Sequence, residues 1–151
     1  MTESNSIAGL FGLHRLGEAS GLFAALLALP SAWGLHFLGG FPLLALAAIG
    51  FAILTIWAAP RASVPVIIDR VAGQWLALWP LSGGLWAMGL PSHVFPWPGW
   101  VGGFLICQVL LNFVPPIRRL AKYGPLWDDL AAGAAAAAIT LFSAAIAHGW
   151  L

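Results

Sequence analysis

The sequence predicts an all-α, polytopic membrane bundle of about five transmembrane helices, built as one domain over residues 1–151. Of the 151 residues, 61% are hydrophobic and 7% are charged, whereas a soluble domain carries roughly a quarter charged residues. The mean hydropathy is +0.93, and each span needs about 20 apolar residues. This length leaves no room for a separate soluble domain, and no basic patch points to nucleic acid.

Glycine, proline and charged residues divide the apolar sequence into the expected spans. The spans are expected at residues 21–38, 43–59, 66–90, 102–114 and 129–148. Gly39, Gly40 and Pro42 predict a tight turn between the first two, and Pro80 predicts a break in the third. The proline, glycine and tryptophan content of residues 91–103 is typical of an interfacial loop.

Isolated aromatic and polar side chains have simple expected roles. The tryptophans, including Trp75, Trp100 and Trp127, are expected to anchor the interface or to pack, and each histidine is expected at the interface. The histidines show no spacing that would build a zinc site. Cys107, the single cysteine, lies in an apolar run and is expected to pack as a small hydrophobe.

The basic residues predict the orientation of the chain. With five spans, six cations fall on or beside one face: Arg15, Arg61, Arg70, Arg118, Arg119 and Lys122. The positive-inside rule makes this face cytoplasmic and places the amino terminus inside. Glu18, Asp69, Asp128 and Asp129 fall at the same face. Any chemistry is therefore expected on the cytoplasmic side, with Asp69 at the mouth of the third span and less buried than its apolar surroundings suggest.

Three carboxylates from two span ends suggest a divalent cation site. Asp69, Asp128 and Asp129 offer the hard oxygen ligands that Mg²⁺ takes together with waters and substrate phosphate. The three cations Arg118, Arg119 and Lys122 precede Asp128 and could hold phosphate oxygens. The combination suits a lipid phosphate at the inner interface.

Simpler roles remain open for the same residues. Asp128 and Asp129 could act as favourable acidic residues at a helix start. Asp69 could pair with Arg61 or Arg118, and the basic linker could set topology by touching anionic headgroups. Cys107 lacks an arginine five residues later, no serine or histidine stands beside an obvious base, and no glycine-rich loop with lysine marks a nucleotide site. Metal-assisted hydrolysis or no chemistry remains, and charges gathered at one face disfavour a transporter.

Three segments resemble the phosphatidylglycerophosphatase A family. They are ASGLFAALLALP at 19–30, VIIDRVAGQWLAL at 66–78 and PPIRRLAKYGPLWDDLAAG at 115–133. Seven residues match the family motifs directly: Asp69, Gly73, Gln74, Trp75, Asp128, Asp129 and Gly133. Four positions depart from the family: Leu22 replaces Thr, Arg70 replaces Glu, and Leu110 and Phe113 stand at Asp and Lys positions.

The resemblance implies a Mg²⁺-dependent phosphatidylglycerophosphatase of the bacterial inner (plasma) membrane. Such an enzyme hydrolyses phosphatidylglycerophosphate to phosphatidylglycerol and phosphate in phospholipid biosynthesis. The expected catalytic and metal-binding residues are Asp69, Asp128 and Asp129, and the expected substrate-binding residues are Arg70, Arg118, Arg119 and Lys122. Trp75 and Trp127 would set the depth of the headgroup. The alternative is a weakened or inactive membrane homologue that binds anionic lipid or a protein partner.

Overall fold

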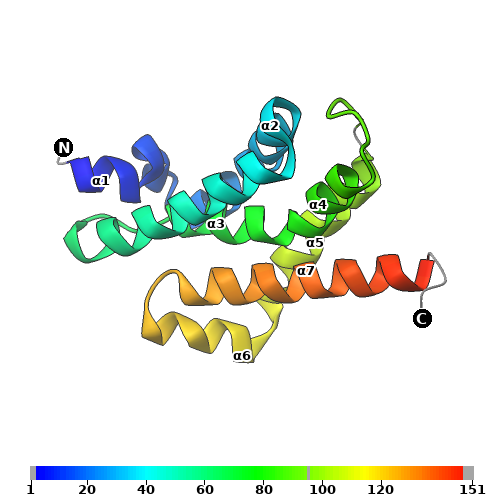
Figure 1. The fold of residues 1–151 in the computed structure, drawn as a ribbon. Coiled ribbons are helices and arrows are strands. Elements are labelled where there is room, and N and C mark those ends of the chain that lie inside the picture. Colours follow the sequence, from blue (N-terminus) through cyan, green and yellow to red (C-terminus); the bar gives the residue numbers. More distant parts are fainter. Residues whose placement is uncertain (1–2, 95, 148–151) are drawn as a thin grey trace.

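The described residues of the chain form helices joined by short connections (Figure 1). The computed structural model describes residues 3–94 and 96–147, apart from the side chains of His14 and Glu18. The elements are α1 (Glu3–Ala8), η1 (Leu10–Ala19), α2 (Ser20–Ala58), η2 (Ala59–Arg61), α3 (Ile68–Ala77), α4 (Trp79–Ala87), α5 (Trp97–Phe113), α6 (Pro115–Arg118), η3 (Arg119–Tyr123) and α7 (Trp127–Ala147). The predicted all-α class is confirmed over these residues.

Helix α2 turns back on itself at a glycine pair. Gly39 and Gly40 have non-helical backbone angles, and Gly40 has a φ of +64°. A Cβ atom on Gly40 would overlap the Trp86 ring of α4, so this position excludes a side chain both by conformation and by space. The predicted turn at these glycines is confirmed, and the chain is helical again at Pro42.

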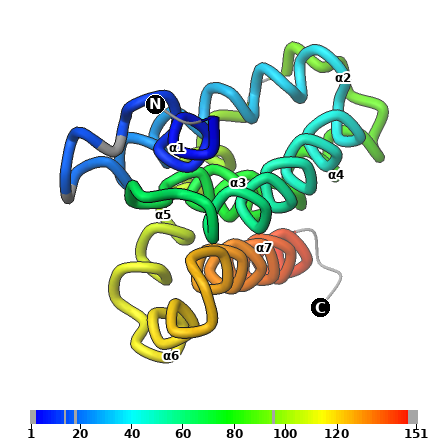
Figure 2. Tube along the Cα trace, turned by 90° about the vertical axis from the view of Figure 1, so that its left-hand side faces the viewer, coloured from blue at the N-terminus to red at the C-terminus, as the bar shows by residue number. Residues whose placement is uncertain are grey.

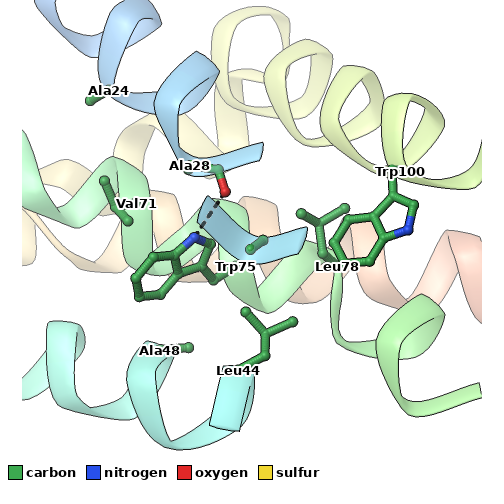
Figure 3. Packing of buried hydrophobic residues seen from close by; sticks show 9 residues of the cluster. Ala24, Ala28, Leu44, Ala48, Val71, Trp75, Leu78 and Trp100 are labelled. Atoms are coloured by element: carbon green, nitrogen blue, oxygen red, sulfur yellow. Dashed lines mark hydrogen bonds between the residues drawn. The ribbon is translucent and has the colours of Figure 1, made fainter. Parts of the chain in front are cut away.

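Both halves of α2 pack against α3 around Trp75 (Figure 3). The indole Nε1 of Trp75 donates to the Ala28 carbonyl at 2.9 Å, and the Phe51 ring lies 4.6 Å from the Trp75 ring, between centroids. Trp75 is 5% exposed and Trp100 is fully buried. Of the two roles expected for tryptophan, Trp75 and Trp100 therefore have the packing role, because the small side chains of α2 leave room for large rings in the core.

Two predicted boundaries shift in the structure. The third apolar run is divided at Leu78, where α3 ends and α4 begins with Pro80 in its first turn. The predicted loop at 91–103 is too long, because α5 already begins at Trp97. Pro98 is compatible with this start because the first turn of a helix leaves its backbone N–H groups unpaired in any case.

Two helical segments are long and apolar enough to cross a membrane, Ser20–Arg61 and Trp127–Ala147. The pair Trp97–Phe113 and Pro115–Tyr123, bent by 71°, would make a third if it counts as one span. These assignments rest on length and composition within the described residues. Five spans and a cytoplasmic amino terminus stay predictions.

The starts of α3 and α7 lie at the same end of the molecule as the η2 turn (left in Figure 1). The turn between α4 and α5 and the last described residues of α7 lie at the opposite end. Helices α3 and α7 therefore run in the same direction. This arrangement positions the acidic residues in the first turn of each helix near one another.

Candidate functional site

Helices α3 and α7 lie side by side (Figure 2) and touch backbone to backbone at two glycines, Gly73 and Gly133. A Cβ atom on Gly73 would overlap the carbonyl of Asp129, and one on Gly133 would overlap the carbonyl of Gly73. Glycine permits this approach because it has no side chain, as at many helix contacts in membranes. The contact lies one helical turn after Asp69 in α3 and at the corresponding turn of α7, so it fixes where the two aspartates meet.

The two aspartates at this crossing are almost completely buried. Asp69 is 4% exposed and Asp129 is 3% exposed. The expectation that Asp69 would be less buried is wrong, since the close crossing and the packing of α2 over α3 exclude solvent from it. Asp69 Oδ1 accepts a hydrogen bond from the backbone N–H of Arg70 at 2.8 Å.

Arg70 supplies the positive charge at the crossing. Its Nε lies 3.5 Å from Asp129 Oδ1, and its side chain is 28% exposed. The same side chain packs against the start of α2, since a Cβ atom on Gly21 would lie 3.3 Å from Arg70 Nε. The open pairing of Asp69 with Arg61 or Arg118 is not found among the described contacts. Instead Arg70 joins α2, α3 and α7 at one point.

Asp128 adds a third carboxylate with an unused oxygen. Its Oδ1 is buried and has no hydrogen-bond partner among the described residues. The charges of Asp128 and Asp69 both act on Asp129, and Arg70 acts on Asp69 and Asp129. Asp69 and Asp129 thus share one guanidinium, and the charge of Asp128 also acts on both of them. An excess of buried negative charge is unfavourable unless a further cation or a proton compensates it.

The basic linker is exposed and separate from the carboxylates. Arg118 and Arg119, together with Pro115, line a hollow of about 300 Å³ on α6 and η3. Lys122 lies with its Nζ 4.7 Å from the centre of the Tyr123 ring. Within the described residues, no hydrogen bond or ion pair connects these three cations to Asp69, Asp128 or Asp129. The structure therefore brings together Arg70 and the aspartates but leaves the linker cations at the surface.

Carboxylate oxygens are the type of ligand that Mg²⁺ binds, but the protein does not by itself surround a metal ion with ligands. Among residues 3–94 and 96–147, no group of three or more His, Cys, Asp or Glu side chains is arranged to hold a metal. Mg²⁺ needs fewer protein ligands than that, because one or two carboxylates commonly bind it with waters and substrate phosphate. The two buried aspartates, Asp69 and Asp129, match this smaller donor set in number and in ligand type.

Sequence reasoning missed two polar pairs between helices, His36 with Ser82 and Gln74 with Gln108. His36 is 1% exposed, and its Nδ1 lies 2.7 Å from the Ser82 hydroxyl oxygen. The expectation of an interfacial histidine is wrong here. Gln74 is 1% exposed and accepts a hydrogen bond from Gln108 at 3.0 Å. A polar residue within an apolar run was the available signal for each of these pairs.

Cys107 and Trp127 differ in burial. Cys107 is 2% exposed in an apolar cluster, as predicted. Trp127 is 54% exposed at the start of α7, which suits an interfacial anchor, whereas Trp75 is part of the core. The predicted joint role of Trp75 and Trp127 in setting headgroup depth is therefore excluded for Trp75.

Comparisons of the chain with protein-family models, curated proteins and solved structures find no match.

Proposed function

We propose that the chain is a Mg²⁺-dependent phosphoric monoester hydrolase that acts on a phospholipid, with phosphatidylglycerophosphate as substrate and phosphatidylglycerol and phosphate as products. The proposal includes membership, as a divergent member, of the phosphatidylglycerophosphatase A family. The observation that carries it is the α3–α7 crossing, which buries Asp69 beside Asp129 with one guanidinium to compensate them. Buried ionisable groups in membrane proteins commonly mark functional sites because retaining them is energetically unfavourable.

The residues divide into three roles. Asp69 and Asp129 would hold the cation, and Asp128 Oδ1 would accept a proton from the attacking water or provide a further ligand. When bound, Mg²⁺ supplies a Lewis acid that shields phosphate charge and stabilises the leaving oxygen. Arg70 would hold the phosphoryl oxygens, because a guanidinium matches phosphate geometry.

Water attack at phosphorus completes the proposed reaction. A new bond forms between the water oxygen and phosphorus, and the bond from phosphorus to the glycerol oxygen breaks. The proton removed from water goes to Asp128, which later returns it to bulk water, and the glycerol oxygen takes a proton from bulk water as it leaves. Arg118, Arg119 and Lys122 would attract the anionic substrate to the cytoplasmic face of the bacterial inner membrane.

The test measures phosphate release from phosphatidylglycerophosphate by the purified full chain in detergent. We expect release with Mg²⁺ and none after chelation. Asp69→Asn and Asp129→Asn should each abolish it, and Asp128→Asn should lower it by roughly 10²- to 10⁴-fold if Asp128 is the base. Glu3→Gln is the matched control, because Glu3 lies in α1 and is exposed. Full activity of a folded Asp69→Asn or Asp129→Asn protein would remove that residue from the mechanism.

The second candidate function is a weakened or inactive homologue that binds anionic lipid or a protein partner. The pairing of Arg70 with Asp129 favours it, because a guanidinium already compensates a carboxylate that the metal would need. This alternative predicts no phosphate release at any Mg²⁺ concentration, with binding retained. Phosphate release measured with and without Mg²⁺ separates the two functions.

A further inference from the structure

An apolar groove lies beside the α3–α7 crossing. It has a volume of about 640 Å³ and is lined by aliphatic and aromatic side chains. Its walls include Leu76 of α3, Leu120 and Tyr123 of η3, and Trp127, Leu130 and Ala134 of α7. The volume falls within the roughly 300–1,000 Å³ of small-molecule clefts. The groove is therefore large enough for part of a lipid and offers it a mainly apolar surface.

One end of the groove has the side chains of a membrane interface. Tyr123 is 66% exposed and Trp127 is 54% exposed, and tyrosine and tryptophan concentrate at the headgroup level of bilayers. Lys122 places its ammonium group 4.7 Å from the Tyr123 ring centre. A cation at this level attracts an anionic headgroup. The groove thus has an apolar body and a positively charged, aromatic mouth.

The groove shares a wall with the carboxylate site. A Cβ atom on Gly133 would lie 3.2 Å from Leu76 Cβ, so Leu76 belongs both to the groove and to the glycine contact. The groove also follows α7, which has the length and composition of a membrane span. An acyl chain in the groove would leave its headgroup at the end where α7 begins, which is also where Asp128 and Asp129 lie.

We infer that this groove binds one acyl chain of a diacyl phospholipid whose anionic headgroup lies against Lys122. The apolar walls would add no affinity for a soluble phosphate compound. Lys122 would add less affinity for a zwitterionic lipid than for an anionic one. Only one part of the inference rests on the proposed function: that the bound lipid presents its headgroup to the aspartates for hydrolysis. Binding itself requires no hydrolysis, so it can be tested separately.

The test compares two alanines on the same helix. Ala134 lines the groove, and Ala138 lies one turn later, is also exposed and does not line it. The full chain is purified in detergent, and retained phosphatidylglycerol is measured by native mass spectrometry. Ala134→Phe should fill the groove and weaken binding by roughly tenfold, which corresponds to 1.4 kcal/mol. Ala138→Phe should bind like the unaltered chain.

A surface variant and a lipid panel make the result independent of folding. Lys122→Gln should weaken phosphatidylglycerol binding by about fivefold, since a lysine near an anionic surface contributes about 1 kcal/mol. Phosphatidylcholine should bind more weakly, and glycerol 3-phosphate should not compete. Any one of three results would refute lipid binding in the groove. They are equal binding by the two phenylalanine variants, unchanged binding by Lys122→Gln, and competition by glycerol 3-phosphate.

The hydrolysis proposal fails or survives by a different measurement. Asp69→Asn should bind phosphatidylglycerol like the unaltered chain while releasing no phosphate. If the unaltered chain hydrolyses the substrate but Ala134→Phe and Ala138→Phe bind lipid equally well, the groove inference fails and the hydrolysis proposal survives. Lipid binding that depends on Ala134 without any hydrolysis would support the groove and reject the enzyme.

Discussion

Replacing Gly73 by alanine tests the contact on which the candidate site depends. The new Cβ atom would overlap the carbonyl carbon and oxygen of Asp129. These are backbone atoms, so no side-chain rotation can relieve the overlap, and α7 must move away from α3. Overpacking of this kind destabilises by about 1–3 kcal/mol. Alanine recovers up to about 1 kcal/mol of helix propensity, which leaves an expected net loss of up to about 2 kcal/mol relative to the unaltered chain and of about 1–3 kcal/mol relative to a glycine-to-alanine change without the overlap.

The control is Gly102→Ala, in the interior of α5. A Cβ atom on Gly102 would meet nothing within 4 Å, so the helix-propensity gain acts alone and the variant should be as stable as the unaltered chain or slightly more stable. The free energy of unfolding in mixed micelles measures both variants. Because Gly73→Ala separates Asp69 from Asp129, phosphate release should also fall under conditions where the variant is folded. Equal stability of the Gly73→Ala and Gly102→Ala proteins would refute the close crossing.

Two other variants test the polar groups buried between helices. Arg70→Gln leaves Asp129 without its ion-pair partner and should destabilise the fold by about 2 kcal/mol. This is less than the roughly 3–5 kcal/mol for breaking a fully buried pair, because Arg70 retains some contact with water. The free energy of unfolding in micelles measures the loss, and an unchanged value would contradict the pairing. Ser82→Ala leaves the buried His36 Nδ1 unpartnered and should cost about 1–3 kcal/mol, while adding His36→Leu should recover part of that loss. Additive losses in this double-mutant cycle would mean that the hydrogen bond contributes nothing.

The sequence was sufficient to predict the fold class and several turns between helices, because these depend on local composition. Long apolar runs predict helices, and the glycine pair at Gly39 and Gly40 predicts a turn that the structure has. The core was harder to predict. Trp75 and Trp100 have the residue type of interfacial anchors, but alanines from α2 at Ala28 and neighbouring turns make space for them in the interior. Burial depends on what packs opposite a side chain, and that partner is distant in sequence.

The candidate site was predictable in its residues but not in its geometry. Asp69 and Asp129 were both selected from the sequence, and the structure places them at one crossing. Their compensation by Arg70 was not foreseen, because Arg70 follows Asp69 directly and would point away from it on an isolated helix. Its ion pair is with Asp129 on another helix. Such a contact becomes visible only when the relative rotation of α3 and α7 is known.

A pattern shared by the two helices explains why these aspartates meet. In α3, Asp69 stands four residues before Gly73, and in α7, Asp129 stands four residues before Gly133. Residues four apart lie on the same face of a helix, so a contact made through the glycines carries both aspartates to the interface. The pattern brings them together only because α3 and α7 run in the same direction (Figure 1). In an antiparallel pair the aspartates would lie on opposite sides of the glycine contact, separated by two helical turns, or about 11 Å.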